Sequence, residues 1–108
     1  LGGVIQAQGQ IMMENTTYDD YGQLLSGSFM DYTMPRASHI PMDFKFKSHP
    51  VPAKTNPLGL KGCGEAGISG ALPTIMNAIL NALETNGYDT DLNMPVTSEK
   101  LWNTINKK

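Results

Sequence analysis

The chain has 108 residues, of which 40 % are hydrophobic and 17 % charged, and its formal net charge at pH 7 is −2. This length suits one domain or part of one, and the mild acidity excludes a dedicated nucleic-acid binder, which would carry a basic stripe. The single cysteine permits no internal disulfide, and no apolar run approaches the ~20 residues of a bilayer span, so a cytoplasmic chain without a membrane span is expected.

The N-terminal third predicts a helix followed by a hairpin. Val4, Ala7 and Ile11 share one face at three- and four-residue spacing, so a helix is expected over residues 4–14. Residues 16–25 are typical of a strand, a turn and a second strand, with Gly22 supplying the turn backbone. The chain begins with Leu1 rather than methionine, and the helical pattern follows directly. We therefore expect a fragment of a longer polypeptide.

The middle of the chain is rich in proline. Five of the seven prolines lie between residues 35 and 57, which excludes long helices there. Phe44 and Phe46 alternate with lysines, a pattern that predicts a short strand with one buried face. Residues 48–67 are otherwise irregular, and a long ordered loop within a domain is often part of a binding site.

Two helices are predicted in the C-terminal third. The first begins at Pro73, carries a broad apolar stripe for core packing, and ends at a left-handed cap formed by Asn86 and Gly87. The second begins at Thr97, with Val96 and Leu101 placed for a hydrophobic staple. The side chains expected to anchor this last helix to the body are Leu101, Trp102 and Ile105.

Glu65 is the leading candidate for chemistry, because four glycines at positions 59, 62, 64 and 67 bracket it. Such glycines let the backbone adopt positive φ or approach a neighbour closely. Two interpretations fit the local pattern. Glu65 is either an exposed loop carboxylate that interacts weakly with the following helix dipole, or a general base at the edge of a cofactor pocket.

Other candidate sites are weaker. Residues 62–67 fit Gly-x-Gly-x-x-Gly, but no clear strand precedes them, so dinucleotide binding is rejected. Cys63 is best explained as a small packing residue, since a lone cysteine lacks metal-site spacing. His39 and His49 are interpreted as ordinary loop histidines, and no metal ligands are predicted.

Five segments in order resemble one family. They are Gly-Gly-Val-Ile-Gln-Ala-Gln-Gly at 2–9, Asp31-Tyr-x-x-Pro35, Gly59-Leu-Lys-Gly-Cys-Gly-Glu65, Pro73-x-x-x-Asn77-Ala78, and residues 91–102. Together they cover almost the whole chain. The set is similar to the C-terminal part of the large, molybdenum-binding subunit of the xanthine dehydrogenase, aldehyde oxidase and aerobic carbon monoxide dehydrogenase family. Ala7 and Cys63 depart from it, standing where glycine and valine are common.

The resemblance implies specific roles. Glu65 matches the active-site base beside the molybdenum, Gly62, Cys63 and Gly64 lie on the pterin side, and Gln6 and Gly9 match another segment near the cofactor. The implied cofactor is molybdenum–molybdopterin, with a cytosine dinucleotide form among the alternatives, and the implied partners are iron–sulfur and FAD subunits or domains. The substrate would be an aldehyde, a heterocycle or carbon monoxide, oxidised with water as the oxygen source.

The predicted fold class is α+β, with helices at both ends packed on a small antiparallel sheet and a long Pro/Gly-rich active-site loop. Residues 1–108 are expected to form a C-terminal molybdopterin-binding fragment that is inactive without the remainder of the large subunit. A charged share below the usual quarter agrees with a surface that something else covers. The alternative function is a separately encoded, non-catalytic assembly or interaction module of such a complex.

Overall fold

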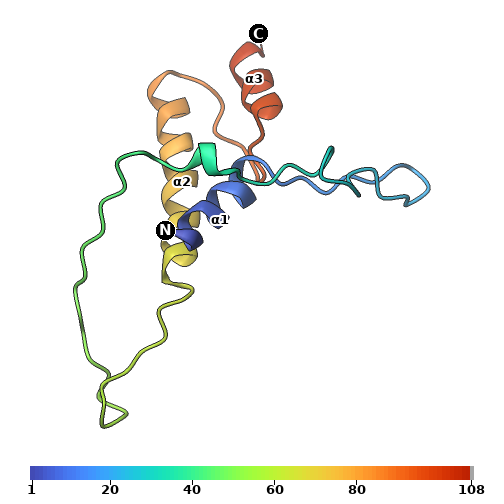
Figure 1. Ribbon diagram of the computed structural model, residues 1–108. Helices are drawn as coiled ribbons and strands as arrows, with labels where there is room; N and C mark the ends of the chain where they lie inside the picture. The colour runs from blue at the N-terminus through green and yellow to red at the C-terminus, as the bar shows by residue number, and fades with distance from the viewer. Residues whose placement is uncertain (108) are drawn as a thin grey trace.

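A computed structural model describes residues 1–107, and its regular elements are helices. They are α1 (Gly2–Met12), the 3₁₀ helix η1 (Ala37–His39), α2 (Ala66–Thr85) and α3 (Ser98–Asn106). Figure 1 shows α1 packed across α2, with α3 at the end of the molecule where α2 finishes. Two irregular segments project from this body in different directions, one between α1 and η1 and the other between η1 and α2.

The predicted α+β fold is wrong, because no sheet forms within residues 1–107. The hairpin is reduced to one antiparallel bridge between Tyr18 and Leu24. Its turn forms as predicted: Gly22 has φ +81°, and the Asp19 carboxylate accepts two turn amides at 2.8 and 2.9 Å. A lone two-stranded ribbon without a covered apolar face is at best marginally stable, which explains why the pairing stops after one bridge.

The strand predicted around Phe44 and Phe46 is also absent. Phe46 is 84 % exposed, and no neighbouring segment among the described residues pairs with this stretch. Alternating hydrophobicity predicts a strand only where a partner strand supplies hydrogen bonds and a core covers one face. Residues 1–107 provide neither of these.

Helix α2 begins earlier than the sequence predicts. Its N-cap is Glu65, so Pro73 lies inside the helix rather than in its first turn. An internal proline removes one backbone hydrogen bond, and the neighbouring Thr74 hydroxyl donates to the Gly70 carbonyl at 2.7 Å. The predicted end is confirmed: Gly87 has φ +74°, and its amide and that of Tyr88 close the last turn as a Schellman cap.

The core lies between α1 and α2 and is small. An ideal Cβ on Gly3 would stand 2.9 Å from the Ile68 backbone nitrogen, so the two helices touch backbone to backbone where they begin. The Val96 amide donates to the Ile11 carbonyl and fastens the chain before α3 to the end of α1. The buried hydrophobic residues are Ala7, Ile11, Ala71, Leu83 and Val96.

Helix α3 begins as predicted but is not anchored as predicted. The Thr97 hydroxyl accepts the Lys100 amide at 3.3 Å, which confirms the N-cap. Trp102, however, is 65 % exposed, and Ile105 is also exposed, while the buried side chain is that of Thr104. The apolar side of α3 therefore lacks a cover among the described residues.

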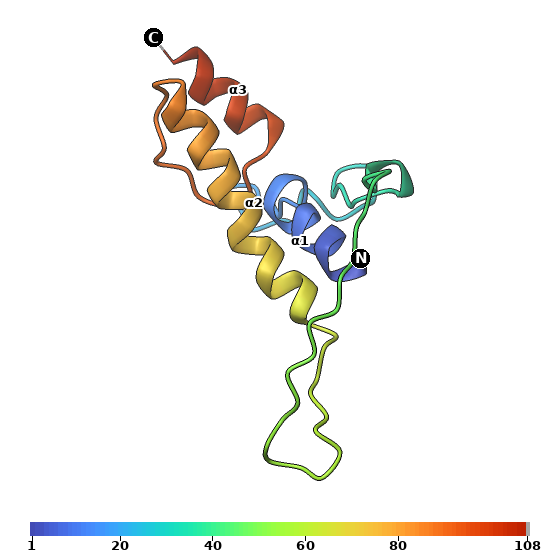
Figure 2. The same cartoon turned by 90° about the vertical axis from the view of Figure 1, so that its left-hand side faces the viewer.

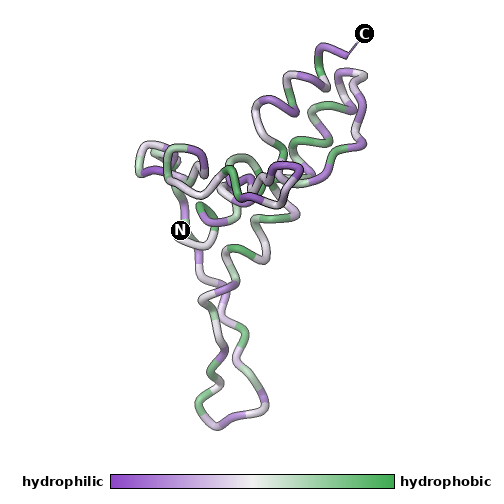
Figure 3. Tube along the Cα trace, turned by 90° about the vertical axis from the view of Figure 1, so that its right-hand side faces the viewer, coloured by the Kyte–Doolittle hydropathy of each residue, from purple (hydrophilic) through white to green (hydrophobic). Residues whose placement is uncertain are grey.

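The chain is extended for its length. Its radius of gyration is 17.8 Å, whereas a compact domain of this size has about 13 Å. Figure 2 shows the loop before α2 projecting well beyond the start of that helix. Hydrophobic residues occur both along α2 and along this loop (Figure 3). By length and composition alone α2 is apolar enough to cross a bilayer, contrary to the sequence-based estimate, although core helices of soluble proteins meet the same criterion.

Candidate functional site

The candidate site lies where the long loop enters α2. Glu65 occupies the N-cap position with φ −91° and ψ −4°, and its carbonyl accepts the Ser69 amide at 3.0 Å. Its side chain is exposed and does not cap the helix. The backbone of Glu65 is thus fixed by a 20-residue helix, while its carboxylate stays available to a partner outside residues 1–107.

The three residues predicted on the pterin side are exposed. An ideal Cβ on Gly62 or Gly64 would meet no atom within 4 Å, so the backbone there is open to close approach. Gly62 and Cys63 also line a hollow of about 330 Å³ between the two limbs of the loop, together with Lys61. Lys61 is the charged member of this lining and gives the otherwise apolar hollow one positive charge.

The tip of the loop is held by one side chain. Asn56 donates to the Leu60 carbonyl and accepts the Leu60 amide, both at 2.9 Å. Gly59 has φ +64°, which a side chain would strain, and it packs against Pro52. Of the four glycines around Glu65, Gly59 is therefore the one that needs positive φ.

The contact between α1 and α2 brings two sequence motifs together. Gly3 belongs to the N-terminal glycine motif, and Gly67 follows Glu65 by two residues. An ideal Cβ on Gly3 would lie 3.3 Å from the Gly67 Cα. Gly67 thus makes a close backbone approach, which glycine permits, and its neighbour is a helix. The sequence signal was a glycine in the first turn of each helix, Gly3 in α1 and Gly67 in α2.

Gln6 and Gly9 have different surroundings on α1. Gln6 is exposed, whereas Gly9 is buried. An ideal Cβ on Gly9 would lie 2.6 Å from both Cγ and Cδ of Pro35, so this position requires glycine for packing. Sequence reasoning did not identify that contact, and a role for either residue beside the cofactor stays a prediction.

A hydrogen bond holds the segment before η1 onto α1. The Tyr32 hydroxyl donates to Oε2 of Glu14 at 3.0 Å. This hydrogen bond is the largest cause of a raised pKa of the Tyr32 phenol. Desolvation and the negative charge of Glu14 raise the pKa further. Tyr32 and Pro35 belong to the same motif, so the structure explains their spacing as the docking of one segment on α1. The sequence alone showed the motif but not its contact.

The two histidines do not form part of the candidate site. Nδ1 of His39 accepts the Arg36 amide at 3.0 Å and thereby caps η1, and His49 is exposed in the loop. Across residues 1–107, no three His, Cys, Asp or Glu side chains gather closely enough to hold a metal ion.

Comparisons with known proteins relate this chain to molybdopterin-binding proteins. Residues 1–41 match the family described as Molybdopterin cofactor-binding domain. Subunit gamma of the 6-hydroxypseudooxynicotine dehydrogenase complex of Paenarthrobacter nicotinovorans is 36 % identical over 102 residues, covering 94 % of this chain and 13 % of that protein. The carbon monoxide dehydrogenase large chain of Hydrogenophaga pseudoflava is 31 % identical over 104 residues, covering 96 % and 13 %.

A solved structure matches the fold over almost the whole chain. The crystal structure of quinoline 2-oxidoreductase from Pseudomonas putida 86 superposes with a TM-score of 0.88 at 32 % identity. The match covers 99 % of this chain and 13 % of that chain. The chain therefore spans only about an eighth of the length of the relatives that it matches.

Proposed function

Because the chain belongs to the family of molybdenum-binding large subunits that includes carbon monoxide dehydrogenase, as its sequence resemblance predicted, we propose that it supplies the base and part of the cofactor cradle of a molybdenum hydroxylase. The substrate class is an aldehyde, a heterocycle or carbon monoxide. Iron–sulfur and flavin partners would carry the electrons away. The rest of the large subunit would complete the site.

One observation supports this proposal most strongly. The Gly3–Gly67 contact holds the glycine motif of α1 against the first turn of α2, immediately after Glu65. Two segments that the family resemblance assigns to the cofactor region thus lie side by side, although 64 positions separate the two glycines. Without this backbone contact, the two motifs would have no fixed relation to each other.

The residues beside Glu65 fit an anionic cofactor. Gly62 and Gly64 leave the backbone open, Lys61 contributes a positive charge, and the start of α2 adds the partial positive charge of a helix N-terminus. These groups, with Gln6 of α1 as a further candidate, would hold molybdenum–molybdopterin, including its cytosine dinucleotide form. When bound, this cofactor supplies the two-electron oxidising centre for hydroxylation with oxygen from water.

Glu65 suits the role of proton acceptor. Its carboxylate is exposed and caps no helix, so no bond at the start of α2 competes for its oxygens. The helix fixes the backbone of Glu65, and so sets the point from which the carboxylate reaches toward a substrate. A general base of this kind contributes about 10²–10⁴-fold to a rate.

The test is Glu65→Gln in the assembled, molybdenum-containing protein. We expect the molybdenum content to stay at the wild-type level and turnover to fall by about 100-fold or more. Glu84→Gln is the matched control, because Glu84 lies near the opposite end of α2, about 28 Å along the helix axis. It should leave turnover at the wild-type level.

Unchanged turnover in Glu65→Gln would reject the role as base. The alternative would then hold, namely that the chain is a non-catalytic assembly module of such a complex. That alternative rests on the extended shape and the exposed apolar side chains described above.

A further inference from the structure

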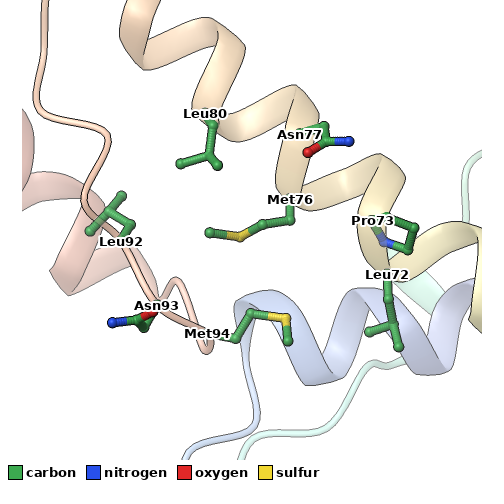
Figure 4. A pocket seen from close by; sticks show the side chains of 8 residues that line it. All are labelled: Leu72, Pro73, Met76, Asn77, Leu80, Leu92, Asn93 and Met94. Atoms are coloured by element: carbon green, nitrogen blue, oxygen red, sulfur yellow. The ribbon is translucent and has the colours of Figure 1, made fainter.

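An apolar groove lies between α2 and the segment that leads to α3. Its volume is about 410 Å³. Met76 and Leu80 point from α2 toward Leu92 and Met94 on the opposite wall (Figure 4). No charged side chain lines it among the described residues, so the groove suits an uncharged occupant.

The groove is separate from the candidate cofactor site. Met76 follows Glu65 by 11 residues in the sequence, which corresponds to about 16 Å along the helix axis. The residues predicted beside the cofactor do not line it. Its apolar walls would also give little affinity for an anionic cofactor.

The exposed area of the chain shows that a large partner is needed. The accessible surface is 8707 Å² for a mass of 11.7 kDa, whereas a compact monomer of that mass exposes about 5,900 Å². The excess of about 2,800 Å² is several times the ~800 Å² that one partner buries in a standard interface.

The distribution of this surface argues against a second copy of the chain. Exposed apolar side chains lie on the segment before η1, on the loop before α2 and on α3, of which Met30, Leu58 and Trp102 are examples. The two projecting segments point in different directions (Figure 1). A two-fold dimer uses one self-complementary patch and would leave the other surfaces exposed.

The lining of the groove favours a peptide over a lipid chain. Asn77 and Asn93 line it beside the apolar residues, and their amides can donate to and accept from a peptide backbone. Acyl chains offer no such partner. The relatives extend about seven times the length of this chain beyond the matched segment, which provides a polypeptide of the required size.

From these observations we propose that the groove seats an apolar segment of the polypeptide that supplies the remainder of the large subunit, an inference that rests on the proposed function. The apolar side chains of that segment would contact Met76 and Leu80. Its backbone would hydrogen-bond Asn77 and Asn93.

The first experiment places a photo-crosslinking amino acid at Met76 of the full chain in its source cells. We expect a crosslink to a polypeptide that carries the upstream molybdenum-binding sequence, identified by mass spectrometry. The same crosslinker at Asn81, an exposed position of α2 outside the groove, should give little of that product. Crosslinks to a second copy, to lipid or to an unrelated protein, or none at all, would each overturn the proposal.

The second experiment measures association. Met76→Glu places an unpaired charge in the apolar groove. It should lower the amount of large-subunit polypeptide that is purified together with the tagged chain by about tenfold or more. Met76→Leu conserves the volume and should preserve recovery, as should the charge control Asn81→Glu. Equal recovery with Met76→Glu would contradict the proposal. Glu65→Gln separates the two proposals, because losing the base should leave the Met76 crosslink intact.

Discussion

The α1–α2 pair and the loop between η1 and α2 use glycine for opposite purposes. In the helix pair, Gly3 lacks a side chain so that two backbones can touch, and Ile11 near the other end of α1 is fully buried. In the loop, Gly59 supplies a positive φ at a tip that one asparagine holds, while Leu58 beside it is exposed. The helix pair holds its own shape, whereas the loop needs a partner to cover it, and Glu65 lies where they join.

The largest effect is expected from Gly3→Ala. The added Cβ would stand 2.9 Å from a backbone nitrogen of α2, so the helices must separate, at a cost of about 1–3 kcal/mol. Hydrogen exchange of the α1 and α2 amides should become at least several-fold faster. Gly2→Ala is the matched control, because no atom lies within 4 Å of its Cβ, and it should leave exchange unchanged or slower. Equal behaviour of the two variants would refute the contact.

A somewhat smaller effect is expected from Gly9→Ala. The new Cβ would overlap the ring of Pro35, but that ring lies on a segment that can shift, so we expect about 1–2 kcal/mol. Faster exchange should be confined to α1 and residues 28–36. Adding Pro35→Ala removes the clashing ring atoms and should restore much of the loss. A double variant no better than Gly9→Ala would show that the overlap is not the cause.

The loop is tested by Asn56→Ala. Both hydrogen bonds to Leu60 are lost, and the expected local destabilisation is about 1 kcal/mol. Exchange should rise at the loop tip and stay constant in α1 and α2, since the loop does not support the helices. Lys54→Ala alters the same loop without these bonds and should have no effect. A change in α1 or α2 would mean that the loop and the helix pair are one cooperative unit.

The smallest effect is expected from Tyr32→Phe. The Tyr32 phenol donates to Glu14 only while protonated, and its pKa is raised above the ordinary value near 10. The stabilisation is therefore complete below pH of about 10 and is lost as pH rises through the raised pKa. As pH rises through the raised pKa, hydrogen exchange at residues 28–36 of the wild type should approach that of Tyr32→Phe. The control is Tyr21→Phe, at a 96 % exposed site, which should match the wild type at every pH. A constant difference between wild type and Tyr32→Phe across this range would exclude titration of Tyr32 as its origin.

Helix caps and buried helix faces could be predicted from the sequence, because they depend on residues that lie close together along the chain. The Thr97 cap, the Gly87 cap and the buried face with Ala7 and Ile11 all follow from spacing within one helix. The start of α1 at Gly2 was missed because glycine is a poor helix former, and the contact that Gly3 makes with α2 was not visible in the sequence.

Features that depend on distant or absent partners could not be predicted. Within the part of the chain that the structure describes, no strand pairs with the segment around Phe44, and no core covers Trp102. The packing of Pro35 on Gly9 joins residues far apart in the sequence, which spacing alone does not reveal. Within the candidate site, the position of Glu65 before a helix was predicted, while the Gly3–Gly67 contact beside it required the structure.

The molybdenum content of Gly64→Leu, measured in the assembled protein, tests most directly whether the cofactor lies against the open backbone beside Glu65. At its Cβ the new side chain meets no atom of residues 1–107, so the fold of this chain should persist. We predict that the variant assembles but loses most of its molybdenum, whereas Gly70→Leu, at an equally open glycine within α2, keeps it. Full molybdenum content and turnover in Gly64→Leu would contradict a cofactor site at the junction of the loop and the helix pair.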